Sequence, residues 1–368
     1  MMERRQILEL WHERQQQPAV LVTLTSTSGS SYRRPGAHVL LLADGRHAGT
    51  ISGGCLEAEV ARKAFWMTRN GAVMQRYSTL FDDTAEIPFG LGCGGEIDIL
   101  LEPADTPECE ALIEAMRSSL AGESRTAITI LPAENQPLQR ILLASNEEKI
   151  FASNSLASDV PSNAAEKFIE HLHPPQRLIL FGAGDDAQPV AKMAALLGWD
   201  VLIADGRAQL ATSERFPAAG LLPLNESLSI SSLHISTNDA VVLMTHSFAQ
   251  DRALLAQLLP LTPGYLGVLG ARHRSSLLVH EVATALNWSI SECAALLHAP
   301  TGLDLGGDAP ESIALAILAE AHARIHNRTG SARRISAGEM LEHLHNATRS
   351  GSPTLCALDQ DQPLPVKK

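Results

Sequence analysis

The first residue that could carry chemistry is Cys55, which closes a short glycine-rich run after an expected strand. Gly53 and Gly54 precede it, and an expected helix follows it directly. A thiol at a helix amino terminus has a lowered pKa, because the helix dipole stabilises the thiolate. A thiolate is a soft ligand for a metal or for sulfur chemistry. The spacing therefore makes Gly53, Gly54 and Cys55 a candidate binding segment.

A second cysteine, Cys93, stands in another glycine-rich turn. Gly94 and Gly95 follow it, ahead of an alternating strand pattern. Glycines there leave room for a bulky ligand beside the sulfur. Two alternatives stay open. Each cysteine could be a small buried side chain in a tight turn, or a zinc site could use His38 and His47, although the spacing fits no zinc ribbon or finger.

Two adjacent arginines, Arg33 and Arg34, lie in the loop that follows the first expected strand. A guanidinium group pairs with a phosphate through two parallel hydrogen bonds. The pair is therefore a candidate phosphate contact, and a solvated loop is the alternative.

The second half of the chain carries a nucleotide-type turn. Gly182 and Gly184 follow the strand that ends at residue 181 and precede an expected helix. Such a turn lets a phosphate approach the helix amino terminus. Asp205 ends the next strand, where an acidic residue can hold a ribose hydroxyl.

Other polar residues converge on the same edge of the expected sheet. Thr245 and His246 end one strand, and Arg272 follows another. Open α/β sheets bind ligands at the carboxyl ends of their strands. The alternative is a Rossmann-like scaffold without a ligand, because Asp185 and Asp186 would repel a pyrophosphate.

These candidates require two domains. Residues 1–160 predict a β-rich α+β domain that bears the cysteines. Residues 161–350 alternate strands and helices, which is typical of a Rossmann-like parallel α/β domain. We expect the polar, proline-containing tail, residues 351–368, to be disordered.

The amino-acid composition and net charge argue against some classes of partner and of protein. The chain has 368 residues, 45% of them hydrophobic, and a formal net charge of −12. This charge argues against nucleic acid or an anionic membrane as a partner. No apolar run approaches the roughly 20 residues that a transmembrane helix needs. The five cysteines are widely spaced and contain no CxxC, which favours reduced thiols and a cytoplasmic location.

Several motifs together resemble the XdhC/CoxI family, the accessory proteins of xanthine dehydrogenase and related molybdenum hydroxylases. The resemblance covers most of the chain. The motifs are TxxxGSSYRRPGA at 25–37, GxISGGCLE at 49–57, GLGCGG at 90–95, GAG at 182–184, Thr245-His246 with Asp251, GxLGxR at 267–272 and GLDLG at 302–306. Asp185 departs from the family's GAGH form of the turn.

The resemblance implies a maturation factor rather than a catalyst. Such a factor binds the molybdenum cofactor (molybdopterin), holds it while a cysteine desulfurase supplies a sulfur ligand, and delivers it to the apo-hydroxylase. Cys55 and Cys93 would then contact the molybdenum or its dithiolene sulfurs. Arg33, Arg34 and the Rossmann crevice would hold the pterin phosphate or a nucleotide extension. A homodimer is compatible with this role.

Two other functions stay open. An NAD(P)-dependent oxidoreductase would bind its dinucleotide at Gly182 and Asp205 and use His246 as acid or base. A non-catalytic adaptor would bind no small molecule. The chain is not expected to be xanthine dehydrogenase itself, because it lacks the iron–sulfur cysteine sets and the length of that enzyme.

Overall fold

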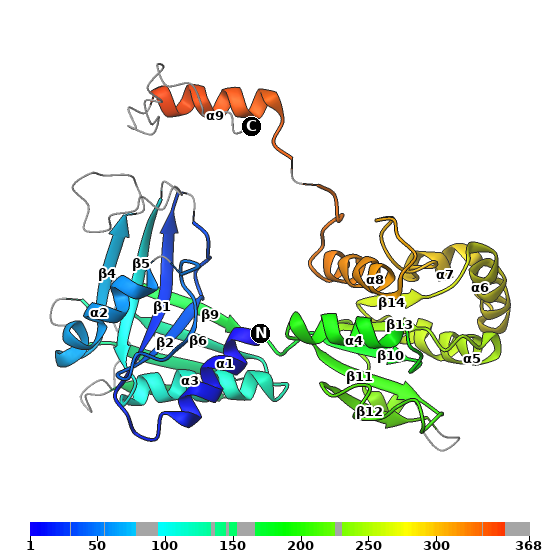
Figure 1. Cartoon of the computed structure of the whole chain (residues 1–368), viewed down its shortest axis with the longest axis horizontal. Helices are drawn as coiled ribbons and strands as arrows, with labels where there is room; N and C mark the ends of the chain where they lie inside the picture. The colour runs from blue at the N-terminus through cyan, green and yellow to red at the C-terminus, as the bar shows by residue number, and fades with distance from the viewer. Residues whose placement is uncertain are drawn as a thin grey trace, which may run out of the picture. The chain divides into compact units, whose positions relative to one another are not determined.

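The computed structural model contains two compact units (Figure 1). The described residues are 1–29, 31–54, 56–78, 95–133, 137–144, 147–152, 166–224, 230–332 and 334–349. The amino-terminal unit comprises Glu3–His173 with Arg333–Lys368, and the Rossmann unit comprises Met1–Met2 with Pro174–Ala332. The division after His173 lies further along the chain than the predicted boundary at 160. Cys55, Cys93, Gly94 and the tail from 351 lie outside the described residues.

A five-stranded parallel sheet forms the centre of the Rossmann unit. Its strands are β10 (Arg177–Phe181), β11 (Asp200–Asp205), β12 (Ala219–Pro223), β13 (Asp239–Leu243) and β14 (Tyr265–Val268). Their order is β12-β11-β10-β13-β14, and all neighbours are parallel. The chain reverses its direction of growth between β10 and β13, where such sheets open a crevice. The parallel strands are almost entirely apolar because both faces of the sheet are covered.

Helices cover both faces of this sheet (Figure 1). One apolar core packs α4 (Ala187–Leu196) and α8 (Pro310–Ile325) against one face. A second core packs α5 (Phe248–Leu258), α6 (Arg272–Leu286) and α7 (Ile290–Leu296) against the other. The predicted Rossmann-like parallel α/β domain is therefore confirmed.

A partly buried polar network ties α8 to the edge of the sheet. The Tyr265 hydroxyl donates to Glu320 across 2.6 Å, and the Glu320 carboxylate lies 3.1 Å from His298 Nδ1. The backbone around His298 bonds to Leu266 and Val268 and so extends the sheet beside β14. The GLDLG segment enters the same network, because Gly302 N–H donates to Glu320.

The amino-terminal unit contains two antiparallel sheets. The strands of the first, sheet A, are β1 (Ala19–Ser28), β2 (His38–Leu42), β3 (His47–Gly49), β4 (Val73–Ser78) and β5 (Glu96–Pro103), in the order β3-β2-β1-β5-β4. Helix α2 (Glu57–Met67) packs its Val60 and Ala64 side chains against one face of β1 and β5. The β-rich α+β prediction is confirmed for this unit.

The second sheet, sheet B, completes the core of this unit. Its strands are β6 (Arg125–Ile130), β7 (Gln139–Ala144), β8 (Glu147–Ala152) and β9 (Lys167–Leu172), in the order β8-β7-β6-β9. Helices α1 (Met2–Glu13) and α3 (Pro107–Leu120) share an apolar cluster with both sheets. Thr106 caps α3 by accepting a hydrogen bond from Cys109 N–H. The remaining helix of the described chain is α9 (Ala337–Arg349).

Two buried pairs of polar side chains join the sheets. Arg140 on β7 bonds to both carboxylate oxygens of Glu102 on β5, each at 3.0 Å, and both side chains are at most 1% exposed. His38 on β2 lies 2.9 Å from Glu170 on β9, and its other ring nitrogen lies 3.0 Å from the Thr23 hydroxyl. His38 is therefore used within the core rather than as a metal ligand.

We expect Arg140→Leu to lower the free energy of unfolding by about 3–5 kcal/mol, because it leaves the Glu102 carboxylate buried without its partner. The urea midpoint of the full chain measures this loss. Arg117→Leu, which removes an exposed pair with Glu114 on α3, is the control and should cost less than about 0.5 kcal/mol. The double variant Arg140→Leu/Glu102→Leu should recover much of the loss. An Arg140→Leu protein as stable as wild type would contradict the role given to this pair.

Candidate functional site

The motif-bearing loops of the amino-terminal unit leave sheet A at one end. Residues 29–37 connect β1 to β2, residues 50–56 follow β3, and residues 79–95 connect β4 to β5. Ser28 pairs with Glu96, and Glu96 pairs with Ser78. Because the strands are antiparallel, the end of β1, the end of β4 and the start of β5 coincide. The described residues that flank Cys93 therefore belong to the same end of the sheet as the arginine loop.

The arginine loop and the Cys55 loop touch through Tyr32. A β-carbon at Gly53 would lie 2.8 Å from Cε1 of the Tyr32 ring, so the ring rests against the glycine backbone. Gly53 also has φ +84°, a conformation that favours glycine. Tyr32 is nevertheless 72% exposed. The contact brings the predicted residues Gly53 and Gly54 beside the loop of Arg33 and Arg34.

The two arginines differ in what they contact. Arg33 bonds to both carboxylate oxygens of Glu3 on α1, at 2.8 and 2.5 Å. Arg34 is exposed, and its guanidinium has no bonding partner among the described residues. A phosphate could be met by Arg34 directly, whereas Arg33 would first have to leave Glu3.

A carboxylate that the sequence reasoning did not single out organises the Cys55 loop. Glu57 is 6% exposed, and its carboxylate accepts five hydrogen bonds from residues 50–54. The donors are the hydroxyls of Thr50 (2.5 Å) and Ser52 (2.6 Å) and the backbone N–H groups of Ile51 (2.8 Å), Ser52 (2.9 Å) and Gly54 (2.9 Å). An acidic residue in the first turn of a helix after a glycine pair was the signal that could have revealed it.

These bonds determine the charge state of Glu57. Burial alone would raise its pKa, but the hydrogen bonds from Ser52 and Thr50 outweigh burial and lower the pKa to about 2. Glu57 is therefore ionised at neutral pH and fixes the loop that leads into residue 55. A carboxylate already occupies the N–H groups that could otherwise have bound an anion.

The other predicted residues of this unit are only partly described. Gly95 is buried and directly precedes β5, whereas Cys55, Cys93 and Gly94 lie outside the described residues. Two further cysteines, Cys109 and Cys293, are buried and free. Burial raises the pKa of both thiols, which agrees with structural roles. Among the described residues, no group of three or more His, Cys, Asp or Glu could hold a metal ion.

In the Rossmann unit the glycine turn is formed as predicted, but acidic side chains fill it. Gly182 has φ +125°, and a β-carbon there would collide with the backbone of Met244. Ala183 N–H, at the heart of the turn, donates to Asp205 across 2.7 Å. Asp205 also pairs with Arg207 at 3.0 and 2.7 Å. Burial opposes ionisation of Asp205, but the Arg207 and backbone hydrogen bonds lower its pKa.

The side chains of Asp186 and His246 pair beside Gly184. Asp186 lies 2.9 Å from Nε2 of His246, and a β-carbon at Gly184 would lie 2.5 Å from Asp186 Oδ1. His246 adopts a left-handed conformation, with φ +61°. Asp185 pairs instead with Arg215 at 2.9 Å. A pyrophosphate at this turn would meet carboxylates where it needs hydrogen-bond donors, so the residues present do not fit a dinucleotide.

The remaining predicted residues stand at the same edge of the sheet. The Thr245 hydroxyl donates to the buried Asp251 across 2.6 Å, and Arg274 donates to the other oxygen of Asp251 at 2.6 Å. Arg272 is exposed at the start of α6. The structure thus brings Gly182, Gly184 and Asp205 together with Thr245 and His246, and Arg274 rather than Arg272 makes the close contact.

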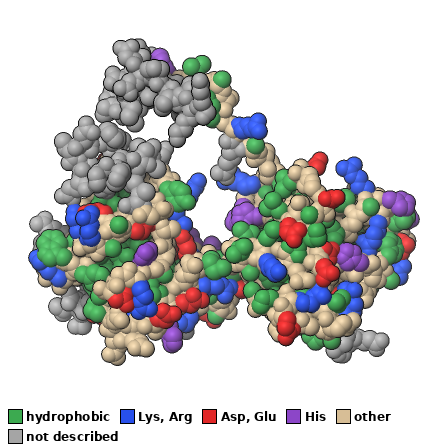
Figure 2. Space-filling view, viewed as in Figure 1, with side chains coloured by type: hydrophobic (Ala, Val, Ile, Leu, Met, Phe, Trp, Pro, Cys, Tyr) green, Lys and Arg blue, Asp and Glu red, His purple; other side chains and the backbone are tan. Residues whose placement is uncertain are grey.

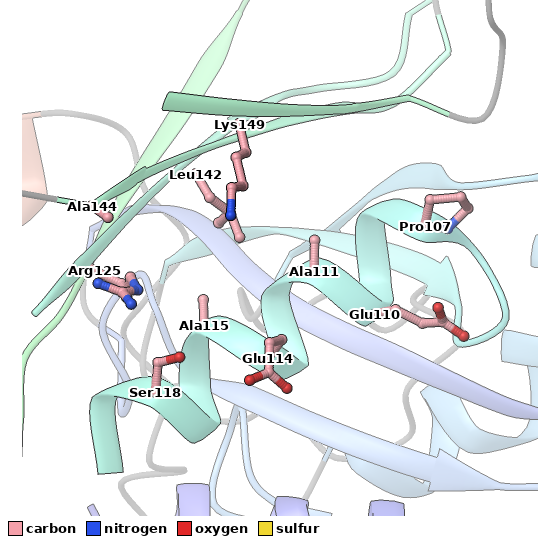
Figure 3. Close-up of a pocket in the computed structure, with 10 residues that line it drawn as sticks. All are labelled: Pro107, Glu110, Ala111, Glu114, Ala115, Ser118, Arg125, Leu142, Ala144 and Lys149. Atoms are coloured by element: carbon pink, nitrogen blue, oxygen red, sulfur yellow. The ribbon is translucent and has the colours of Figure 1, made fainter. Parts of the chain in front are cut away.

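One cavity in the amino-terminal unit lies away from all of these residues. It has a volume of about 490 Å³ and opens between α3 and sheet B. Figure 3 shows Lys149 reaching down from β8 toward α3, with Arg125 beside it and Glu110 and Glu114 on the helix. The cavity contains none of the motif residues.

Charged side chains of both signs are mixed on the face seen in Figure 2. Figure 2 shows Lys and Arg interspersed with Asp and Glu rather than gathered into one basic field on the visible face. Within the described ranges no helix combines the length and apolarity needed to cross a membrane.

Two family models match the chain. The XdhC and CoxI family matches residues 12–78, and the XdhC Rossmann domain matches residues 178–321, so together they cover more than half of the sequence. The chain belongs to the XdhC and CoxI family. The resemblance that the sequence motifs indicated is therefore confirmed.

Similar proteins extend the match along most of the chain. A protein of Bacillus subtilis (strain 168) named as a probable xanthine dehydrogenase subunit is 28% identical over 83% of this chain and 92% of its own length. The molybdenum cofactor insertion chaperone PaoD of Escherichia coli (strain K12) is 28% identical over 85% of this chain and 86% of its own. A crystal structure described as a xanthine dehydrogenase from Bacillus halodurans is 26% identical, with a TM-score of 0.72 over 91% of this chain and 99% of that one.

The Glu57 bonds predict a pH dependence. The pKa of Glu57 in the folded protein, about 2, is below the ordinary value for a glutamate. Its stabilising effect is therefore complete above about pH 4.5 and is lost as pH falls toward 2. We expect Glu57→Gln to lower the free energy of unfolding at pH 7 by about 1–3 kcal/mol.

Urea midpoints between pH 2 and 7 check this expectation. The difference between wild type and Glu57→Gln should shrink as pH falls through that range. Glu110→Gln, an exposed change on α3, is the control and should follow wild type throughout. A constant difference at all pH values would show that Glu57 is not held as a carboxylate.

Proposed function

We propose that this chain is a maturation factor that binds the molybdenum cofactor and delivers it to a molybdenum hydroxylase of the xanthine dehydrogenase type. The observation that carries the proposal is the similarity, over 85% of the chain, to a protein named as a molybdenum cofactor insertion chaperone. The similarity to a probable xanthine dehydrogenase subunit supports the class of client. The chain would act as a carrier and not as the hydroxylase.

The amino-terminal unit offers the groups that such a cargo needs. Cys55 and Cys93, as thiolates, would supply soft ligands to the molybdenum or its dithiolene sulfurs. The exposed Arg34 would hold the phosphate of the pterin. Glu57 would fix residues 50–54, the segment that leads into Cys55. The cofactor itself supplies the molybdenum centre at which the client enzyme oxidises its substrate.

The proposed role also involves two partner proteins and a cytoplasmic location. A cysteine desulfurase would supply the terminal sulfur ligand while the cofactor is held, and the apo-hydroxylase would then receive it. Both steps require a cytoplasmic protein with accessible loops at the end of sheet A. Transfer is tested by mixing loaded protein with apo-hydroxylase and following the recovery of hydroxylase activity.

The Rossmann unit supports the carrier over an NAD(P)-dependent oxidoreductase. In a dinucleotide enzyme the acidic residue after the second strand is needed for the ribose. Here both oxygens of Asp205 bond to Arg207, and one also accepts from Ala183. Asp186 and His246 cover Gly184 as well. We therefore propose no nucleotide in this turn.

The proposal is tested by purifying the protein from a host that makes molybdenum cofactor. We expect wild type to retain molybdenum and a pterin that becomes fluorescent on oxidation. Cys55→Ala and Cys93→Ala should lose most of both while staying folded, because each removes a soft ligand. Metal analysis and pterin fluorescence per chain measure the result.

Cys109→Ala and Cys293→Ala are the matched controls, because both thiols are buried and free. They should retain the cofactor at the wild-type level. A wild-type protein that carries neither molybdenum nor pterin, and instead binds NADH in a fluorescence titration, would overturn the carrier proposal.

A further inference from the structure

An ion pair joins the arginine loop to helix α1. Glu3 lies in the first turn of this helix, and Arg33 lies in the loop between β1 and β2. The Nη1 and Nη2 groups of Arg33 donate to the two carboxylate oxygens of Glu3, at 2.8 and 2.5 Å. A guanidinium group binds a phosphate in this same two-bond geometry. Glu3 therefore occupies the Nη1–Nη2 edge of Arg33 and neutralises its charge.

This pair is accessible to water, unlike the buried pair that joins the two sheets. The Arg33 and Glu3 side chains are 28% and 34% exposed. The side chains of the Arg140–Glu102 pair are at most 1% exposed. An ion pair that water reaches contributes little to stability, because water and dissolved ions compete for both charges. An anion of higher charge than a carboxylate can therefore replace Glu3 at Arg33.

The loop and the helix are each held in place by contacts other than this pair. The loop is closed by two backbone hydrogen bonds between Leu24 on β1 and residues 36 and 37. Helix α1 buries Ile7 and Leu10 in the apolar cluster that it shares with α3. Breaking the ion pair therefore leaves both elements where they are, so the pair can open without local unfolding.

Both partners have a favourable interaction available after they separate. Glu3 stays in the first turn of α1, where a negative charge interacts favourably with the helix dipole. Arg33 is the neighbour of Arg34, whose exposed guanidinium has no bonding partner among the described residues. The two guanidinium groups together match the charge of a phosphate monoester, which is about −1.5 to −2 at neutral pH. A single carboxylate at Arg33 carries less charge than this.

We propose that Glu3 is an internal competitor of the phosphate at Arg33. Without a phosphate, the Glu3 carboxylate neutralises Arg33, and Arg34 is the first group that the phosphate meets. Arg33 then exchanges the carboxylate for the phosphate, and Glu3 is released to solvent at the start of α1. This inference rests on the proposed function, and it adds Glu3 as the residue that sets the affinity of the arginine loop for phosphate.

The test measures the binding of inorganic phosphate to the full chain by phosphorus NMR. We expect Glu3→Gln to bind phosphate about three- to tenfold more tightly than wild type, because it removes a competing negative charge beside Arg33. The double variant Glu3→Gln/Arg33→Gln should lose this gain. The urea midpoint of Glu3→Gln should stay near that of wild type, since the pair is accessible to water.

Glu13→Gln is the matched control. It removes the same charge near the other end of α1, where Glu13 forms an exposed pair with Arg46 at 3.0 Å. It should bind phosphate as wild type does. An equal gain in Glu13→Gln would show a general effect of net charge and would overturn the role given to Glu3.

The other outcomes separate this inference from the carrier role. Phosphate binding by Glu3→Gln that equals or falls below that of wild type would overturn the inference, because Glu3 would then position Arg33 rather than compete at it. Absence of phosphate binding in both proteins would overturn it also. Tighter binding by Glu3→Gln in a protein that never carries molybdenum or pterin would support the inference and overturn the carrier role. Retained cofactor with unchanged phosphate affinity would do the reverse.

Discussion

The Glu57 carboxylate is the constraint on which the candidate site depends. It draws two hydroxyls and three backbone N–H groups of residues 50–54 onto one buried charge. The loop needs glycine at 53 and 54, because both have a positive φ. Glu57 is the first residue of α2, whose Val60 and Ala64 are buried against sheet A. The position of the Cys55 loop is thus fixed by the packing of a whole helix.

A carboxylate also accepts a backbone hydrogen bond in the glycine turn of the Rossmann unit. Asp205 accepts the Ala183 N–H in the glycine turn, much as Glu57 accepts the N–H groups of its loop. Both turns have the glycines that usually bring backbone donors to a phosphate. Glu57 takes three backbone donors of its loop, and Asp205 takes one, the Ala183 N–H. The glycines here shape a tight turn, and binding must use other groups.

The sequence predicted the features that depend on residues close together along the chain. The alternation of strands and helices, with Gly182 after one strand and Asp205 after the next, was sufficient for the Rossmann unit. The sequence could not show that Arg207 and the Ala183 N–H would bond to the Asp205 carboxylate, because both contacts form only in the folded turn. Strand β9 was not predicted, because Lys167–Leu172 pairs with β6 some forty residues earlier. The Arg140–Glu102 pair joins two different sheets, so no short sequence pattern predicts it either.

The filled turns also bear on which ligands these two turns can bind. Phosphates and nucleotides are abundant anions, and an open glycine turn at a helix amino terminus can bind them. Hydrogen bonds lower the pKa of both Glu57 and Asp205, so both carboxylates stay charged at neutral pH and keep their bonds to the backbone N–H groups of the two turns. Specificity can come from excluding competitors as well as from binding the right ligand.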